Sequence, residues 1–511
     1  RRHLGIDLAC QQTAGLHLAQ LCGQNLLRDV PDGLFQFAET QGAVHQVTQD
    51  EHLPFIADER QCGLDRAGGQ LLFCGRFGQF HEKNLLVNAI CANSIFWVTT
   101  PQYCAYFTDC HYGFIIESPK GKSNPNIEKE NKILAKFNKT DGKINNDTTA
   151  YLIEKQVKKY PNNIAVICED KTITYGELDK KANCLANHLI KNGIKNNDIV
   201  CIMTNRSIET IVAMYAVLKA GGAFLNIDPT YPLDRTKYYI ESSKAQYVLT
   251  QRELKDRVKE IPNCIEIDLD NEIYNGNSSK PNVDIKMNDL SYIIYTSGST
   301  GVPKGVMLNQ VGLANMAKAM TKALDYLHDG KIHTLLSVTS TPFDIFVYEI
   351  IVSLTHGQRI VMSNNAEHRN PKLLEKLMEK YNTDVMTVTP SLMKIVYDNR
   401  SENSPLKLVK NMVFGGEPLP EKFVKDLKAL DDDITVFNIY GPSEITVLSN
   451  VQNLNGETEI TTGPPIMNTQ IHILDKNKKR VPIGVVGEIY ISGIQVGEGY
   501  LGKPELTKEK F

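Results

Sequence analysis

The sequence lacks several features that would place it in a special class of protein. No apolar run reaches the roughly 18 residues needed to cross a bilayer, and Arg1 and Arg2 lead into no signal-peptide core. The formal net charge is only −3, which does not favour a nucleic-acid or membrane-surface partner. The eleven cysteines include no Cys-x-x-Cys pair, which disfavours a zinc or redox site. We expect a cytoplasmic protein with free thiols and with neither nucleic acid nor membrane as a partner.

Lysine is absent from residues 1–82, which contain six arginines and eleven glutamines, whereas all 42 lysines follow. No helical or strand period is sustained in the first 110 residues. We leave residues 1–118 unassigned as a segment of foreign composition, either an upstream remnant or a sequence joined to the true gene. Residues 119–148 are polar and rich in turn formers, which predicts a linker before a domain over 149–511. Because the first residue is not Met, we expect a partial or processed chain.

From Asp198 onward, short apolar runs alternate with helical patterns: DIVCIMT, SIETIVAMYAVLKAGG, AFLNID, PLDRTKYYIESSKA and QYVLT. Over residues 208–218 the apolar positions recur at three and four, and Gly221 stands where a C-terminal cap belongs. This alternation predicts a multi-lobed α/β fold with parallel sheets flanked by helices. Ligands of such sheets bind beyond the carboxyl ends of the strands, so we expect the chemistry in the loops that follow them.

The segment YIIYTSGSTGVPKGV, residues 292–306, is an apolar strand that runs into a loop rich in glycine and hydroxyl groups. Glycines let backbone N–H groups approach oxyanions, hydroxyls add donors and Lys304 supplies charge, so the pattern predicts a phosphate-binding loop. It is not a Walker A loop, because Pro303 precedes the lysine and Gly305 follows it. A P-loop kinase or ATPase is therefore disfavoured.

This loop resembles the phosphate-binding signature of adenylate-forming enzymes. Five further segments resemble motifs of nonribosomal peptide synthetase adenylation domains: ITYGELDKKANCLANHL, LKAGGAFLNIDPTYPLDR, FDIFVYE, NIYGPSE and GEIYISGIQVGEGYLGKPELTKEKF. The resemblance covers about residues 127–511 and implies the large subdomain of such a domain. Its expected activity is to join an amino acid to AMP with ATP and Mg²⁺, releasing pyrophosphate, and then to load a phosphopantetheine thiol on a partner peptidyl carrier domain. The small C-terminal subdomain, with its catalytic lysine, is expected beyond Phe511.

The resemblance also implies which residues bind ATP. The phosphate loop is expected to contribute Thr296, Ser297, Gly298, Ser299, Thr300, Gly301 and Lys304. The remaining nucleotide contacts are expected from Gly415, Gly416, Glu417, Asn438, Tyr440, Gly441 and Ser443. Glu444 is expected to bind magnesium, which prefers carboxylate oxygen, and to act in catalysis with Thr296 and Lys304. From the residues alone, Glu444 could be a helix-start carboxylate and residues 415–417 an ordinary turn.

Asp344 in FDIFVYE resembles the family's partner for the substrate α-ammonium, although it could instead N-cap the helix that follows. The side-chain pocket is expected from eight positions: Ile345, Tyr348, Thr387, Val413, Gly415, Ile439, Val447 and Leu448. None of these residues carries a charge, so a charged substrate side chain would be uncompensated and a neutral, largely apolar amino acid is expected. Core packing explains any single one of them equally well.

Some positions depart from the family pattern. Asn309 and Gln310 stand where a histidine is usual, Asn226 where a proline is common, and Glu498 where Arg or Lys is common. Alternatives within the same fold are a D-alanine–carrier ligase and an acyl-CoA synthetase. Asp344 argues against fatty-acid substrates, which lack an ammonium, but does not exclude D-alanine. A catalytically silent nucleotide-binding fragment is the alternative from another class.

Overall fold

The computed structural model describes residues 125–511, except Pro262 and residues 297–301, and several short strands between residues 66 and 117. The chain divides into two compact units, which we describe separately. The first contains the residues up to Lys136 together with His472–Tyr490. The second contains Phe137–Ile471 and Ile491–Phe511. All of the candidate site residues belong to the second unit.

The first unit contains a small antiparallel sheet in the order β3-β4-β5-β6. Its strands are β3 (Leu86–Ile90), β4 (Ile95–Thr100), β5 (Tyr103–Phe107) and β6 (Phe114–Glu117). A separate pair is β1 (Arg66–Ala67) and β2 (Gln70–Leu71). The rest of the segment 1–118, which we expected to be foreign to the fold, lies outside the described residues.

The range expected to be a linker, residues 119–148, includes the helix α3 (Pro125–Phe137). After this helix, Asn138 exchanges two hydrogen bonds of 2.9 Å with the backbone of Ile471. Thr140 donates a third, of 2.7 Å, to the carbonyl of Thr469. Thr469 and Ile471 both belong to β21 (Thr469–Leu474), which pairs with β22 (Glu488–Gly493). Residues 138–140 therefore pack along β21.

The first large sheet of the second unit has seven strands and is mainly parallel. In sheet order they are β12 (Cys264–Glu266), β11 (Tyr247–Thr250), β9 (Ile199–Met203), β10 (Ala223–Asn226), β13 (Leu290–Thr296), β14 (Lys304–Asn309) and β23 (Gly499–Tyr500). The pairs from β12 to β13 are parallel, whereas β14 and β23 add to the edge antiparallel. The expected parallel pattern therefore ends at β13.

The second large sheet has eight strands. In sheet order they are β20 (Asn450–Asn453), β19 (Thr435–Tyr440), β18 (Asn411–Phe414), β17 (Val385–Val388), β15 (Thr334–Ser337), β16 (Arg359–Met362), β7 (Ile164–Cys168) and β8 (Lys171–Thr174). All pairs are parallel except the two at the edges, β19 with β20 and β7 with β8. The predicted α/β architecture of parallel sheets with helices is confirmed.

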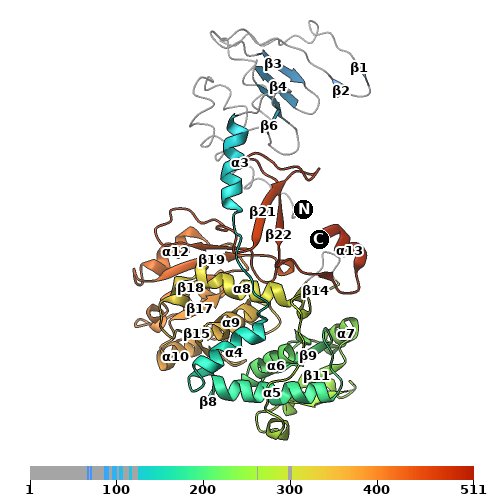
Figure 1. The fold of residues 1–511 in the computed structure, drawn as a ribbon. Coiled ribbons are helices and arrows are strands. Elements are labelled where there is room, and N and C mark those ends of the chain that lie inside the picture. Colours follow the sequence, from blue (N-terminus) through green and yellow to red (C-terminus); the bar gives the residue numbers. More distant parts are fainter. Residues whose placement is uncertain are drawn as a thin grey trace. The chain divides into compact units, whose positions relative to one another are not determined.

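Helices alternate with these strands along the chain (Figure 1). They are α4 (Thr149–Lys159), α5 (Tyr175–Lys191), α6 (Ile208–Lys219), α7 (Leu233–Ser243), α8 (Gln310–Ala323), α9 (Asp344–Thr355), α10 (Pro371–Tyr381), α11 (Pro390–Asp398), α12 (Glu421–Lys428) and α13 (Pro504–Lys510). The local sequence explains where several of these helices begin or end. Thr174 and Glu177 form a capping box at the start of α5, and Gly221, at φ +81°, follows α6 as predicted.

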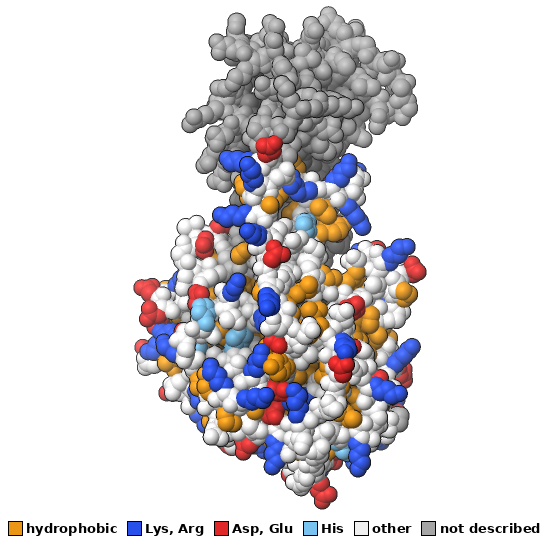
Figure 2. All heavy atoms as spheres, in the orientation of Figure 1, with side chains coloured by type: hydrophobic (Ala, Val, Ile, Leu, Met, Phe, Trp, Pro, Cys, Tyr) orange, Lys and Arg blue, Asp and Glu red, His pale blue; other side chains and the backbone are white. Residues whose placement is uncertain are grey.

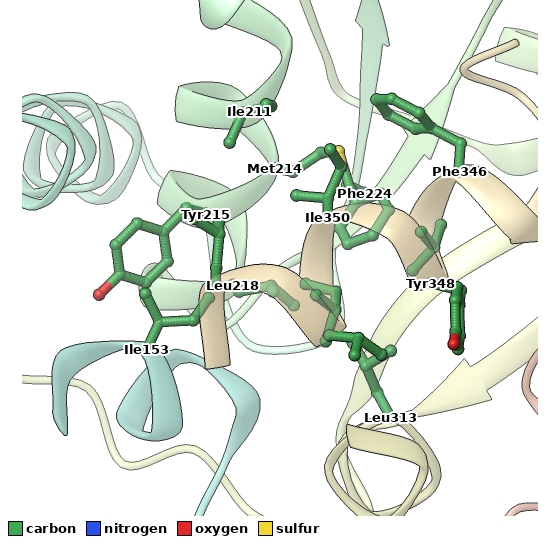
Figure 3. Close-up of a cluster of buried hydrophobic side chains, with 14 of the residues drawn as sticks. Ile153, Ile211, Met214, Tyr215, Leu218, Phe224, Leu313, Phe346, Tyr348 and Ile350 are labelled. Atoms are coloured by element: carbon green, nitrogen blue, oxygen red, sulfur yellow. The ribbon is translucent and has the colours of Figure 1, made fainter. Parts of the chain in front are cut away.

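Two helices, α6 and α9, lie inside the core of the second unit. All residues of α6 are buried, as are all residues of α9 from Phe346 to Thr355. Figure 3 shows α9 crossing a cluster with Met214 of α6 and Leu313 of α8, and Tyr348 lies at the end of this cluster away from Ile153. A helix that is apolar on all sides is stable only when protein surrounds it. The surrounding core therefore stabilises α9.

Charges of both signs are interspersed on the face of the described residues that Figure 2 shows. This face does not present the field of one sign that attracts nucleic acid. In the part of the chain that the structure describes, none of the helices combines the length and the apolar character of a membrane span.

A buried ion cluster joins three helices of the second unit. Lys219 Nζ of α6 lies 2.6 Å from Glu154 Oε1 of α4 and 2.9 Å from Asp179 Oδ1 of α5. Lys280 Nζ lies 2.6 Å from the second oxygen of Glu154. Lys219 and Glu154 are only 4% and 6% exposed. The buried Lys219 ammonium therefore serves two carboxylates, and Lys280 supports one of them.

Replacing Lys219 by methionine should lower the free energy of unfolding by about 3–5 kcal/mol, because the buried Glu154 and the partly buried Asp179 lose a shared partner. Urea denaturation measures the loss. Lys237→Met is the matched control, because Lys237 forms a solvent-exposed pair with Glu260 at 2.7 Å, and such pairs add little to stability. Equal, small losses in the two variants would contradict the role given to the cluster.

Candidate functional site

The expected phosphate loop connects β13 to β14, and Thr296 at the end of β13 lies opposite Lys304 at the start of β14. Five residues expected in this loop lie outside the described residues: Ser297, Gly298, Ser299, Thr300 and Gly301. Thr296 Oγ1 is buried and has no hydrogen-bond partner in the described part of the chain. A buried hydroxyl normally has a partner. This hydroxyl, beside a lysine, therefore suits contact with an oxyanion.

Tyr500 of β23 connects the lysine and the carboxylate expected to act on the phosphates. Its hydroxyl donates to Glu444 Oε1 at 2.5 Å and lies 3.4 Å from Lys304 Nζ, which donates to it. The Lys304 ammonium also lies 4.5 Å from the centroid of the Tyr500 ring, within the range of a cation–π interaction. Burial, and then the Glu444 carboxylate, raise the pKa of Tyr500, so its hydroxyl remains a donor at neutral pH. The three side chains form one connected cluster.

Asp344 is the first residue of α9, and Phe343 occupies the N-cap position. Ser443, expected on the phosphate side, donates its hydroxyl to Asp344 Oδ2 at 2.5 Å. Burial raises the pKa of Asp344, an effect that the Ser443 hydrogen bond reduces without cancelling. Within the described residues, no lysine, arginine or histidine forms an ion pair with this carboxylate. A partly buried carboxylate without a neighbouring cation is suited to an ammonium ligand.

Tyr292 of β13, which the sequence analysis did not assign, lies close to this carboxylate. Burial raises the pKa of Tyr292, and the charge of Asp344 raises it further. Tyr292 and Asn226 line one small cavity between β10, β13 and the loop before α9. The Tyr292 hydroxyl and Asn226 Oδ1 are both buried and have no hydrogen-bond partner among the described residues. Asn226 Nδ2 donates to the carbonyl of Thr341 at 3.1 Å. Asparagine at this position, where proline is common in the family, therefore connects β10 to the loop before α9.

The first group of residues expected near the adenine follows β18. Gly415 is buried, and a Cβ there would lie 2.6 Å from Ile439 Cγ1, so only glycine fits between the strands. Gly416 has φ +80°, which favours glycine. Glu417 accepts a hydrogen bond of 2.9 Å from the backbone N–H of Ser391, at the start of α11. The strand end therefore leads into a defined turn, with Glu417 tied to the neighbouring helix.

The second group follows β19. Tyr440 ends this strand with its side chain exposed. Asn438 Nδ2 donates to the carbonyl of Thr461 at 2.7 Å. A Cβ at Gly441 would lie 2.4 Å from Leu448 Cα, so the chain can cross itself there only with glycine. Tyr440 is thus free to stack on a planar ligand, whereas the Asn438 side chain is already bonded to protein.

The expected side-chain pocket combines α9, parallel strands and one turn. Tyr348 of α9 shares a core with Val413 and Ile439 from β18 and β19. Thr387 of β17 is the register neighbour of Val413. The Thr387 and Tyr348 hydroxyls are buried and make no hydrogen bond within the described residues, although Tyr326 lies close to the second. The same region includes the remaining expected residues: Ile345, Gly415, Val447 and Leu448.

Glu444, Val447 and Leu448 belong to one tight turn. Its 3-10 helix η7 (Ser443–Ile445) ends at Thr446, with φ +59°, and Val447 follows with φ +73°. The Leu448 N–H donates to the Thr446 carbonyl at 3.0 Å, which closes a three-residue turn with the φ of the rare classic γ-turn. A left-handed conformation costs an L residue roughly 1–2 kcal/mol, and it is least favourable for β-branched residues. Such strain is concentrated at functional sites.

Residues 153–501 match the sequence pattern of the family described as AMP-binding enzyme. The chain belongs to this family. Gramicidin S synthase 2 of Brevibacillus brevis is 36% identical to this AMP-binding enzyme over 78% of the chain and 9% of the synthase. The dimodular nonribosomal peptide synthase of Bacillus subtilis is 34% identical over 75% of the chain and 16% of the synthase. The chain therefore spans less than a fifth of the length of either curated relative.

Two solved structures resemble this AMP-binding enzyme over most of its length. The AMPPNP-bound nonribosomal peptide synthetase FmoA3 has a TM-score of 0.69 at 25% identity, over 75% of this chain and 41% of that chain. The N-terminal subdomain of Klebsiella oxytoca NpsA, in complex with 3-hydroxybenzoyl-AMSN, has a TM-score of 0.63 at 21% identity, over 71% of this chain and 90% of that chain. The predicted fold, the large subdomain of an adenylation domain, is confirmed.

Two residues that the sequence analysis did not assign, Tyr500 and Gln495, make central contacts in the site. Both lie in GEIYISGIQVGEGYLGKPELTKEKF, so the resemblance located the segment but not their roles. Tyr500 is 56 residues from Glu444 and 196 residues from Lys304 along the chain. The pairing of β23 with β14 brings Tyr500 to the strand that carries Lys304, and η7, which carries Glu444, also packs on β14.

Tyr500→Phe should lower the free energy of unfolding by about 1.5–3 kcal/mol, because the Glu444 carboxylate loses a hydrogen bond while the ring remains beside Lys304. Chemical denaturation of the ligand-free protein measures the loss. Tyr381→Phe is the control, since its exposed hydroxyl donates at 3.0 Å to the neutral carbonyl of Glu169. A loss no larger than that of the control would show that the hydroxyl does not hold Glu444.

Proposed function

We propose that this AMP-binding enzyme activates an amino acid as its aminoacyl-adenylate in the cytoplasm. A carboxylate oxygen of the amino acid attacks the α-phosphorus of ATP, and the bond from this phosphorus to the bridging oxygen of the pyrophosphate breaks. The products are aminoacyl-AMP and pyrophosphate. The observation that carries the proposal is Asp344, a partly buried carboxylate at the start of α9 that forms no ion pair with a cation among the described residues.

An amino-acid substrate supplies the charge that this carboxylate lacks. The α-ammonium has three N–H donors, and Asp344 retains acceptor capacity beside its bond from Ser443. Burial raises the pKa of Asp344, because a partly buried carboxylate loses part of its solvation. A bound ammonium would lower that pKa, because an opposite charge favours the ionised form. A fatty-acid substrate would leave the carboxylate uncompensated.

The other end of the site suits the phosphates of ATP. Lys304 and the Thr296 hydroxyl would stabilise charge that develops on the phosphates as pyrophosphate leaves. Glu444 fits a magnesium ligand, because this ion is usually held by one or two carboxylates together with substrate phosphates. Within the described residues no group of three or more His, Cys, Asp or Glu side chains could hold a metal, so Glu444 would act with the nucleotide. Bound magnesium would neutralise phosphate charge.

The pocket residues support a neutral substrate side chain. Their side chains are apolar apart from the hydroxyls of Tyr348 and Thr387, so an ionic side chain would have no partner there. The buried Thr387 hydroxyl has no hydrogen-bond partner within the described residues, whereas the Tyr348 hydroxyl lies beside Tyr326, and a neutral side chain with a hydrogen-bonding group would satisfy Thr387. We therefore extend the expectation of an apolar substrate to include neutral polar side chains.

The relatives support a place in nonribosomal peptide synthesis, where the adenylate would be passed to the phosphopantetheine thiol of a peptidyl carrier domain. Transfer to the thiol would release AMP and form a thioester. A D-alanine–carrier ligase would make the same demand on Asp344, and it differs in the size of its substrate. Tyr348 and Ile439 are bulky, which favours a pocket different from that of a D-alanine ligase.

Asp344→Asn should reduce amino-acid-dependent pyrophosphate exchange more than a hundredfold, because the ammonium loses its counter-charge at a cost of roughly 3–5 kcal/mol. ATP affinity should remain. Asparagine keeps the size of the side chain and can still accept from Ser443. Exchange is measured in a protein extended through the family's C-terminal subdomain, and ATP affinity by calorimetry.

Asp325→Asn provides the control, because this exposed carboxylate accepts a hydrogen bond from Asn453 at 3.2 Å outside the site. It should leave exchange unchanged. Near-normal exchange in Asp344→Asn would refute the pairing with the ammonium and would favour a ligase for substrates without an amino group.

A further inference from the structure

Gln495, in the loop between β22 and β23, forms hydrogen bonds to both ends of the strained turn around Thr446 and Val447. Its Nε2 donates to two backbone carbonyls, those of Ile445 at 3.1 Å and Leu448 at 2.9 Å. These carbonyls lie on either side of Thr446 and Val447, the two residues in the left-handed conformation. One side-chain amide therefore holds both ends of the turn.

The backbone of the same loop makes two more bonds to the turn. The carbonyl of Gln495 accepts from Thr446 Oγ1 at 2.7 Å. The N–H of Gly497 donates to the carbonyl of Glu444 at 2.8 Å. The residues just before β23 thus hold the turn along its length, while Tyr500 holds the carboxylate of Glu444.

The orientation of the Gln495 amide is determined from its other side. Asn315 of α8 donates through Nδ2 to Gln495 Oε1 at 2.5 Å, and both side chains are fully buried. Asn315 Oδ1 accepts in turn from Asn468 Nδ2 at 2.9 Å. Because Oε1 is engaged as an acceptor, Nε2 must face the turn as a donor. The chain of amides anchors the turn to the helix that follows β14 and Lys304.

We infer that Gln495 is a positioning residue for adenylation, which holds the strained turn so that Glu444 and the pocket residues Val447 and Leu448 keep their places together. The inference rests on the proposed function. Two successive left-handed residues without glycine persist only where the surroundings determine them. Without the amide, the turn can relax toward ordinary backbone angles, and this moves the metal ligand and the pocket wall at the same time.

The test replaces Gln495 by methionine, which has a similar length but neither the donor nor the acceptor. ATP binding to the 511-residue chain is measured by calorimetry over a series of Mg²⁺ concentrations. We expect ATP affinity to increase with Mg²⁺, and the Mg²⁺ concentration at which it reaches half of its maximum is the measured quantity. This concentration should rise roughly 10–100-fold, the usual effect of losing a residue that orients a metal ligand. Affinity for the amino acid that supports the fastest exchange should fall as well.

Gln452→Met is the matched control. Gln452 is a buried glutamine of β20 whose Nε2 donates to the carbonyl of Glu459 at 2.9 Å, and whose Oε1 accepts from the N–H of Thr461 at 2.7 Å. The control loses the same number of side-chain atoms and similar bonds away from the strained turn. It should lower the melting temperature and leave the Mg²⁺ dependence unchanged.

Thr446→Val is a milder second variant for the case in which Gln495→Met does not fold. It keeps the shape of the side chain and removes only the bond to the carbonyl of Gln495. The Mg²⁺ requirement should shift in the same direction by a smaller factor. Folded variants with an unchanged Mg²⁺ requirement would overturn the inference. Absence of Mg²⁺-dependent ATP binding in the unaltered chain would instead count against the proposed function.

Discussion

Helix α9 is buried from Phe346 to its end, and this burial is the constraint on which the site depends. The helix packs against α4 and α8 and against the strands β15 and β16 of the eight-stranded sheet. Its position is therefore set by the largest hydrophobic core of the second unit. The same packing places Asp344 at the edge of the core, where its carboxylate is partly buried, and brings Tyr348 to the side-chain pocket that we propose. In the proposed function, a substrate ammonium would be the partner of this carboxylate.

The other parts of the site come from strand ends that approach the start of α9. β13 ends at Thr296, β18 leads to Gly415 and β19 leads to Tyr440. The turn after β19 returns Ser443 to Asp344 and carries Glu444 toward Lys304 through Tyr500. The hydrogen bond between Ser443 and Asp344 thus joins the residues expected at the amino acid to those expected at the nucleotide. Binding of either substrate would act on the same set of contacts.

Much of the fold could be predicted from the sequence because its signals are local. The apolar spacing over 208–218 and the following Gly221 mark α6, and the alternation of runs marks the parallel sheets. The antiparallel addition of β14 was not predicted, since an apolar run does not show the direction in which it pairs. The five residues 297–301 of the phosphate loop remain a prediction, as do the catalytic and binding roles.

The contacts that organise the site could not be predicted, because they join residues far apart in the chain. Gln495 is 47 residues from Leu448, and no spacing rule connects a loop amide to a turn carbonyl. The departures at Asn309 and Glu498 are a second example. Each was a separate exception in the sequence, yet Asn309 Nδ2 donates to Glu498 Oε1 at 2.7 Å, so the two altered positions form one pair. This hydrogen bond connects the last residue of β14 to the residue before β23.

The central claim is that the site activates a neutral amino acid, and pyrophosphate exchange over a panel of carboxylic acids tests it most directly. The panel contains neutral, acidic and basic amino acids, D-alanine and fatty acids, and the protein is extended through the family's C-terminal subdomain. We expect exchange with one or a few neutral amino acids and little with fatty acids, because only an amino acid supplies a cation to Asp344. Preferred exchange with Lys, Arg, Asp, Glu or a fatty acid would contradict the account.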